Sequence, residues 1–233
     1  MCCDSGVSDR PEQLRAVAEQ LAADAAAFVR RRRAELFGGG AHPIPRGAVQ
    51  AKTEDMGDHK STDWAIHHLK TAPTDKPLFL ALGYIKPHLP WYVPQMYYDR
   101  FPLADIQLPV TKEGDLNDVP KAGVKMAGPE GDHAAVLKGD QWKKAVQAYL
   151  ATISFLDDQV GRLLEGLDQS PRKDKTIIVW WTDHGWNLGE KEHWRKFALW
   201  EEATRTSMAI IAPGVTKPGT RCDAPVDYTN LYP

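Results

Sequence analysis

The chain has 233 residues, which suits one domain of ordinary size or one domain with an appendage. Its 29 basic and 31 acidic side chains nearly cancel, so no global field favours nucleic acid or an anionic membrane. With 42% hydrophobic and 26% charged residues, the composition is that of a globular protein and excludes a disordered chain.

A helix is expected first, because apolar residues recur at steps of three and four along one face. These residues are Leu14, Val17, Leu21, Ala25 and Phe28. The helix runs into four arginines at residues 30–33, whose cations suit the negative end of a helix dipole. Residues 38–60 are rich in glycine, proline and charge, which predicts a linker.

The next expected elements are short. Residues 63–69 predict a helix with Trp64 packed inward. The apolar run over residues 78–82 predicts a strand buried on both faces. Prolines over residues 86–94 exclude a helix and predict a stiff loop. Residues 102–135 alternate proline, glycine and charge, so a long surface excursion is expected there.

The clearest helix is expected over residues 142–167, where apolar residues keep helical spacing throughout. Two more strands follow at residues 176–181 and 208–212, both short and apolar. Strands separated by long helices imply right-handed crossovers and a mainly parallel sheet. The sequence therefore predicts an α/β fold, in which functional groups gather beyond the carboxyl ends of the strands.

Asp183 and His184 follow directly after one of these strands, and Gly185 lets the backbone turn sharply. A carboxylate beside an imidazole can hold a divalent cation, and the carboxylate favours a hard ion such as calcium. An isolated Asp-His pair is more often a turn cap beside a packed histidine. Here the dense charge and two tryptophans over residues 186–196 favour a metal site.

Groups that can bind an anion lie after two of the strands. His88 is held between prolines, and rigid presentation suits a hydrogen-bond donor or a general acid; the alternative is a histidine fixed by loop packing. Lys86 adds a cation two residues earlier. After the Asp-His pair, Arg195 and Lys196 are both candidates to neutralise an anion, and spacing does not choose between them.

Two long motifs in this order resemble the type I sulfatases, above all the iduronate-2-sulfatase-like and choline-sulfatase-like branches. The first is Lys-Pro-His-Leu-Pro over residues 86–90. The second is Trp-Thr-Asp-His-Gly-Trp-Asn-Leu-Gly-Glu over residues 181–190. The likeness extends over residues 54–233 and implies an alkaline-phosphatase-like core, here incomplete.

The resemblance implies a sulfuric ester hydrolase. In that family a cysteine matured to formylglycine attacks the sulfate ester, while calcium and surrounding cations stabilise the charged oxygens. By motif position, Asp183 and His184 resemble the metal ligands. His88 and Lys196 resemble catalytic groups that contact the sulfate, and Lys86 is a further substrate-binding cation. The implied substrate is the sulfate ester of a sugar or a small alcohol.

The sequence departs from the family at the nucleophile. The family motif is Cys-x-Pro-Ser-Arg or similar, and none of Cys2, Cys3 and Cys222 has this context. The three cysteines also form no readable disulfide framework or zinc motif. The paired aspartates that complete the metal site early in the family are missing as well. We therefore expect a fragment without the formylglycine nucleophile, whose activity alone is doubtful.

Residues 1–53 do not resemble a sulfatase and are expected to be a helical segment and linker, with residues 54–233 as a partial sulfatase domain. The first segment weakly resembles the N-terminus of bacterial inositol-monophosphatase-like proteins. No apolar leader opens the chain, and no apolar run reaches about 18 residues, the length of a membrane span. As written, the chain is expected in the cytoplasm, although full-length relatives are often exported.

Two other functions stay open. One is a phosphoesterase or phosphonate hydrolase of the same superfamily, which uses Asp and His for zinc or manganese and a threonine or serine as nucleophile. The other is a non-catalytic remnant that binds an anion or a sulfated sugar. The bound metal separates the first from a sulfatase, and sulfate affinity without turnover favours the second.

Overall fold

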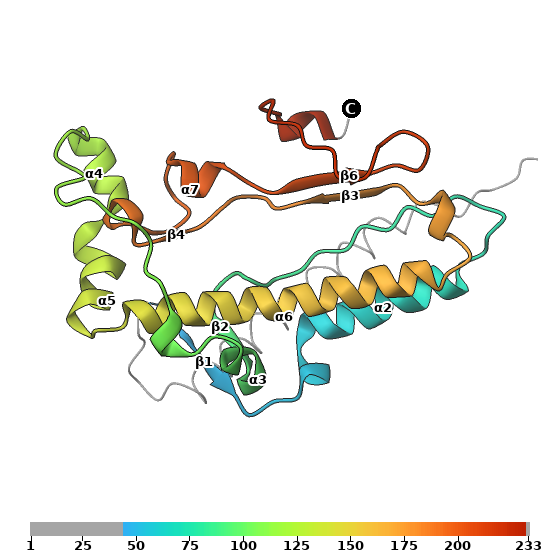
Figure 1. Ribbon diagram of the computed structural model, residues 1–233, viewed down its shortest axis with the longest axis horizontal. Coiled ribbons are helices and arrows are strands. Elements are labelled where there is room, and N and C mark those ends of the chain that lie inside the picture. Colours follow the sequence, from blue (N-terminus) through green and yellow to red (C-terminus); the bar gives the residue numbers. More distant parts are fainter. Residues whose placement is uncertain (1–43, 232–233) are drawn as a thin grey trace, which may run out of the picture. The chain divides into compact units, whose positions relative to one another are not determined.

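The computed structural model describes residues 44–231 (Figure 1). The helix predicted from Leu14 to Phe28 lies outside these residues, as do Cys2 and Cys3. The described part is a mixed α/β structure with a small parallel sheet. None of its helices is long and apolar enough to cross a bilayer.

The helices and strands of this part are short except for two helices, which pack side by side. The α-helices are α2 (Gly57–Thr71), α3 (Gln95–Asp99), α4 (Lys121–Ala127), α5 (Ala134–Lys138), α6 (Trp142–Asp168) and α7 (Glu201–Thr204). The strands are β1 (Arg46–Val49), β2 (Trp91–Pro94), β3 (Ile178–Trp181), β4 (Asn187–Leu188), β5 (Trp194–Arg195) and β6 (Met208–Ile211). The 3₁₀ turns are η1 (Thr53–Asp55), η2 (Leu103–Asp105), η4 (Lys173–Lys175), η5 (Glu190–Glu192) and η6 (Tyr228–Leu231), and η3 (Pro129–His133) is a π-helical turn.

Helix α6 is central to the fold and confirms the prediction made from apolar spacing. Its buried face carries three small side chains, Ala145, Ala148 and Ala151, followed by Phe155. Small side chains let β2 and α3 approach the helix closely. Tyr97 of α3 meets Phe155 edge-on, with ring centroids 5.3 Å apart. The hydrophobic core therefore lies where α6, β2 and α3 meet.

Strands β1 and β2 form the parallel pair, with Arg46 opposite Trp91. The linker predicted over residues 38–60 is thus wrong in part, because β1 and the start of α2 lie within it. The loop predicted over residues 86–94 likewise ends in β2. Trp91 is fully buried, so the core holds this short pair together. The two strands lie far apart in the sequence, and no local pattern indicates their pairing.

Strands β3 and β6 confirm the two strands predicted at residues 176–181 and 208–212. They pair antiparallel, with Ile178 opposite Ile211, so the small parallel sheet of the fold does not include them. Parallel neighbours need a crossover connection, usually a helix of several turns. Between β3 and β6 the chain forms only the β4–β5 hairpin and the four-residue α7, which return it in the opposite direction.

Residues 78–82 run without assigned strand structure and pair with no strand of the described part, so the strand predicted there is not formed. Their exposure alternates, with Leu78, Leu80 and Leu82 half-buried and Phe79 88% exposed. One side of the segment therefore packs and the other is open. The predicted burial on both faces is wrong, but the segment still leads directly into the loop of His88.

The excursion predicted over residues 102–135 is more ordered than expected. It contains α4 and η3, and Ala127 and His133 are buried. Its prolines and glycines mark the ends of helices: Pro120 precedes α4, and Gly128 follows it in the left-handed region at φ 61°. Composition alone hid these helices because they are short.

Helix α2 begins at Gly57, before the position predicted for it. Trp64 is 49% exposed, so its predicted inward packing is wrong. The buried positions include Asp58, Thr62, Ala65 and Leu69, which recur at steps of three and four and face away from Trp64. Trp64 lies off this buried stripe, although the helix as a whole packs against α6.

The approach of α2 to α6 depends on Gly166. A Cβ atom there would lie 2.7 Å from Cγ1 of Ile66, a β-branched side chain that cannot swing away easily. Gly166→Ala is therefore expected to lower the free energy of unfolding by about 1–3 kcal/mol. Gly161→Ala, with open space around it in the same helix, is expected to raise it by about 0.5–1 kcal/mol. Denaturant unfolding measures both, and equal effects would contradict the packing.

Candidate anion and metal site

His88 and Lys196 lie 108 residues apart in the sequence and meet in the structure, where Nζ of Lys196 is 3.0 Å from Nε2 of His88. Nδ1 of His88 lies 2.7 Å from the carbonyl oxygen of Leu89. A carbonyl only accepts, so Nδ1 carries the proton and Nε2 accepts from the ammonium. The pair thus offers a cation and an imidazole at one place.

Lys86 lies in the same loop, but its ammonium is used within the loop. Its Nζ donates to the carbonyl oxygen of Pro90, and its backbone N–H donates to Asp58 at 2.9 Å. Burial lowers the pKa of Lys86 to about 8, while the Asp58 carboxylate acts to raise it. The structure therefore shows Lys86 supporting its own loop, and its contact with substrate stays a prediction.

The stability of the fold is expected to depend on Lys86 in alkaline solution. The folded chain has a pKa of about 8 for this group against an ordinary value of 10.5, so between these values the unfolded chain binds more protons. The free energy of unfolding should then rise from about pH 8 to 10.5, by up to about 3 kcal/mol, as the burial cost is relieved. Lys86→Met should lack this rise. Denaturant unfolding at several pH values compares the two proteins, and identical pH profiles would contradict the assignment.

The turn after β3 brings Asp183 and His184 together. Oδ2 of Asp183 lies 3.3 Å from Nε2 of His184, and Oδ1 accepts the backbone N–H of His184 at 3.1 Å. Nδ1 of His184 donates to the carbonyl oxygen of Gly185 at 2.8 Å. In the neutral ring Nε2 then turns its lone pair toward the carboxylate, and two such electron-rich atoms favour a shared cation.

A divalent metal fits this pair as two ligands of a larger set. A carboxylate oxygen and a neutral imidazole nitrogen are both metal donors, and the side chain of Asp183 is 83% exposed, so an ion can reach it. The residues that the structure describes gather no group of three or more His, Cys, Asp or Glu that could enclose a metal. The pair therefore offers two donor atoms, and its role as a metal site stays a prediction.

Trp186 lies beside both histidines of the candidate site, His88 and His184. Its ring centroid lies 5.6 Å from that of His88 and 6.2 Å from that of His184. Nζ of Lys196 lies 5.9 Å from the same centroid, within reach of a cation–π attraction. The fully buried Trp91 packs against the Trp186 indole, with ring centroids 5.9 Å apart. Sequence reasoning noted Trp186 only as part of a dense segment and gave it no role.

The β4–β5 hairpin directs Lys196 toward this ring. Gly189 lies in the hairpin turn at φ 120°, and a Cβ there would lie 2.4 Å from the ring of Trp142. Arg195 has φ 77°, a left-handed conformation that is unfavourable for a side chain other than glycine. Its guanidinium donates to Asp132 at 2.6 Å. The structure thus pairs Lys196, and not Arg195, with His88.

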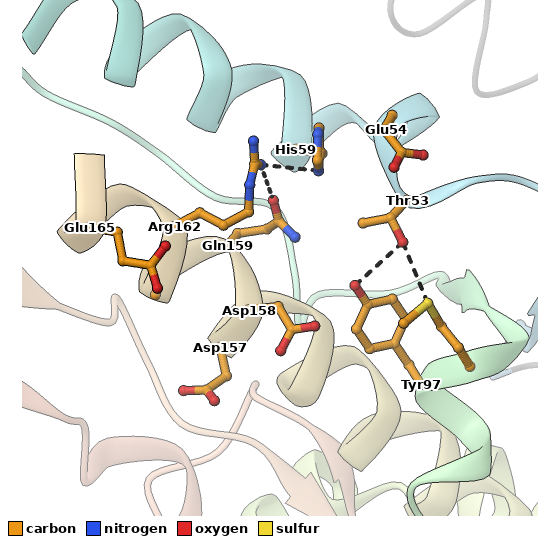
Figure 2. Close-up of a pocket in the computed structure, with 11 residues that line it drawn as sticks. Thr53, Glu54, His59, Tyr97, Asp157, Asp158, Gln159, Arg162 and Glu165 are labelled. Carbon is orange, nitrogen blue, oxygen red and sulfur yellow. Dashed lines mark hydrogen bonds between the residues drawn. The ribbon is translucent and has the colours of Figure 1, made fainter. Parts of the chain in front are cut away.

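A separate hollow lies between η1, α2, α3 and α6 (Figure 2). It is an open pocket of about 610 Å³ whose lining includes no residue of the predicted site. Asp157 and Asp158, the one Asp-Asp pair of the chain, line it. Asp158 accepts two bonds from Arg100, at 2.9 and 3.0 Å, which fix α6 to the end of α3. The charge of Asp158 therefore serves helix packing.

Among solved structures, the fold is similar to the phosphonate monoester hydrolase SpPMH from Silicibacter pomeroyi. The TM-score is 0.63 at 24% identity, over 81% of this chain and 42% of that chain. At this identity the likeness concerns the fold alone. The fold is therefore alkaline-phosphatase-like.

Comparison of the sequence with known proteins identifies the family within this fold. A family model described as Sulfatase matches residues 24–233. A sulfatase from Formosa agariphila is 41% identical over 191 residues, which cover 80% of this chain and 37% of that protein. The iduronate 2-sulfatase of Homo sapiens is 35% identical over 177 residues, which cover 68% of this chain and 31% of that protein. The chain belongs to the sulfatase family.

The chain spans about a third of the length of these curated relatives. The family match begins at residue 24, upstream of the boundary predicted at residue 54, and the division of the chain there stays a prediction. The roles predicted for the site residues also stay predictions, and their geometry is the basis for the proposal that follows.

Proposed function

We propose that this chain is part of a sulfuric ester hydrolase and forms one wall of its catalytic pocket. The observation that carries the proposal is the 3.0 Å contact between His88 and Lys196, which Trp186 links to His184. Membership of the sulfatase family supports the reaction class. A sulfate ester is a compact anion, and cations with hydrogen-bond donors are the groups that hold one.

His88 and Lys196 can exchange partners when an anion binds. Lys196 would release Nε2 of His88 and donate to a sulfate oxygen instead. The freed Nε2 can take a proton from solvent water and, as an imidazolium, donate it to the oxygen of the departing alcohol. Negative charge grows on these oxygens as the sulfur–oxygen bond breaks, and both groups would stabilise it.

Asp183 and His184 are the proposed holders of a divalent cation. Calcium is the proposed ion, because the exposed carboxylate of Asp183 is the hard oxygen donor that calcium prefers. Such an ion supplies further stabilisation of negative charge on the sulfate oxygens. We assign the nucleophile to no residue, since exposed Cys222 lies outside the motif in which formylglycine forms.

A sulfated sugar or a small alcohol sulfate is the proposed class of substrate. The human relative is named an iduronate 2-sulfatase, which supports an ester on a sugar. The exposure of the His88–Lys196 contact supports a sulfate at this pair, because an anion in solution can reach both side chains.

Hydrolysis assays on the purified chain test the reaction class. An aryl sulfate, an aryl phosphate and a phosphonate monoester would each be offered with calcium, zinc or manganese. We expect weak or no hydrolysis, because no cysteine lies in the nucleophile motif. Sulfate ester turnover that is lost in Asp183→Asn would refute the expected inactivity. Preferential phosphonate hydrolysis with zinc or manganese would replace the sulfatase proposal.

A further inference from the structure

Asp58 is a buried carboxylate in the first turn of α2, with 5% of its surface exposed. Its two oxygens accept the backbone N–H groups of Ile85 and Lys86, both at 2.9 Å. The backbone N–H of His88 donates in turn to the carbonyl oxygen of Ile85 at 2.9 Å. A single carboxylate thus holds the backbone of the loop from which His88 projects.

Thr62 makes a second attachment from the same face of α2. Its hydroxyl donates to the backbone carbonyl of Asp58 at 2.9 Å and lies 3.1 Å from the hydroxyl of Tyr84. Residues four apart lie one above the other on a helix, so the side chains of Asp58 and Thr62 both bind the same short segment. Residues 84–86 are therefore fastened to α2 at two adjacent points.

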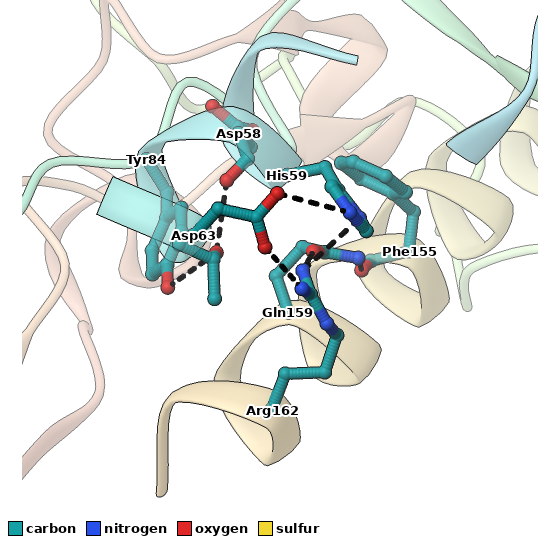
Figure 3. Close-up of polar contacts among 8 residues, drawn as sticks. Asp58, His59, Asp63, Tyr84, Phe155, Gln159 and Arg162 are labelled. Atoms are coloured by element: carbon teal, nitrogen blue, oxygen red, sulfur yellow. Dashed lines mark hydrogen bonds and ion pairs between the residues drawn. The ribbon is translucent and has the colours of Figure 1, made fainter. Parts of the chain in front are cut away.

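The neighbouring face of α2 is fixed to α6. Arg162 donates to Nδ1 of His59 at 3.0 Å and to Asp63, and Nε2 of His59 lies 3.5 Å from Asp63 (Figure 3). The same guanidinium donates to the fully buried Gln159 at 2.9 Å. Helix α2 is thus held on one face by α6 and carries the loop on the other.

We propose that Asp58 is a positioning residue for the anion site, because it anchors the loop that sets His88 opposite Lys196. The inference rests on the proposed function of the His88–Lys196 pair. A charged carboxylate is costly to bury unless donors compensate it, and two backbone N–H groups do so here. Within the described part, these two amides have no other acceptor.

Asp58 also acts on Lys86 through its charge. The carboxylate raises the pKa of Lys86 against the larger lowering by burial. Removing the charge should therefore lower the pKa of Lys86 below its value of about 8. A change in loop packing alone, with more exposure to water, would raise this pKa instead.

Asp58→Asn in the full chain tests the inference, with Asp63→Asn as the matched control on the face that meets α6. Asparagine keeps the shape but has one acceptor oxygen, so one of the two amides loses its partner. The amides of Ile85 and Lys86 should exchange at least about tenfold faster with solvent. The affinity for inorganic sulfate should fall at least about fivefold. Asp63→Asn should leave loop exchange and sulfate affinity within about twofold.

The outcomes separate the inference from the proposed function. Faster loop exchange with unchanged sulfate affinity would overturn the positioning role and leave the anion site intact. Unchanged exchange with intact affinity would also overturn it. A wild-type chain that does not bind sulfate would overturn the inference and the proposed function together. If Asp58→Asn does not fold, Tyr84→Phe removes the second attachment without touching the carboxylate, and the same two readouts apply.

Discussion

Gly185→Ala is expected to displace the turn that carries Asp183 and His184. A Cβ at Gly185 would lie 2.0 Å from the carbonyl oxygen of Glu202 and 3.2 Å from that of Arg205, and both are backbone atoms. The turn is also bonded there, since the N–H of Gly185 donates to a backbone carbonyl at 2.8 Å. The clash cannot be relieved by rotating a side chain. We expect the free energy of unfolding to fall by about 3 kcal/mol or more.

Gly83→Ala is the matched control for this prediction. It lies in the extended segment before the His88 loop, and a Cβ there meets no atom within 4 Å. Its effect on the free energy of unfolding should stay within about 0.5 kcal/mol. Denaturant unfolding compares the two variants with the wild-type chain. Equal stability of Gly185→Ala and Gly83→Ala would show that the turn is not pressed against α7.

Trp186→Ala is expected to damage both halves of the site at once. The indole contacts His88, His184 and the Lys196 ammonium on its outer side and packs against the hydrophobic core on its inner side. Removing a large, partly buried aromatic should cost about 3 kcal/mol of unfolding free energy. Sulfate affinity should fall as well, because Lys196 loses its cation–π partner.

Trp64→Ala provides the control of the same residue type. Trp64 is 49% exposed on α2 and lies at a tilt against His68, with ring centroids 4.1 Å apart. Its removal should cost about 1 kcal/mol or less and leave sulfate affinity unchanged. Thermal unfolding together with sulfate titration tests both variants. The role of Trp186 is contradicted if its variant retains wild-type sulfate affinity.

Elements with strong local signals could be predicted from the sequence. Helix α6 has a sustained apolar period, and β3 and β6 are short β-branched runs, so each is found within a few residues of its expected place. Pairing could not be predicted in the same way. The β1–β2 pair joins distant segments, and β3 meets β6 antiparallel because no crossover helix separates them. Tertiary contacts decide both arrangements.

The candidate site was predictable as two motifs, but not as one arrangement. The stiff loop of His88 and the turn of Asp183 were expected after strand ends, where ligands of α/β folds gather. Spacing could not choose between Arg195 and Lys196, because the choice depends on Asp132 and His88, which are distant in sequence. Contacts of this kind become visible only in three dimensions.

The roles of two residues that support the candidate site could not be predicted from the sequence. Asp58 precedes the loop that it holds by 27 and 28 residues, and nothing near it indicates a site. Trp186 follows the Asp-His-Gly run directly, so its position was a hint, but a tryptophan in a dense segment is more often a packing residue. Its role depends on a ring that lies between two distant motifs.

Calorimetric titration of the purified chain with inorganic sulfate tests most directly the central claim, that His88 and Lys196 form an anion site. The proposal predicts that the wild-type chain binds sulfate and that Lys196→Gln weakens the affinity at least about tenfold. Lys191→Gln is the control, since that ammonium lies in the same hairpin but is bound to Asp115 at 2.7 Å. It should leave the affinity within about twofold. Equal sulfate affinity of Lys196→Gln and the wild-type chain would contradict an anion site at His88 and Lys196.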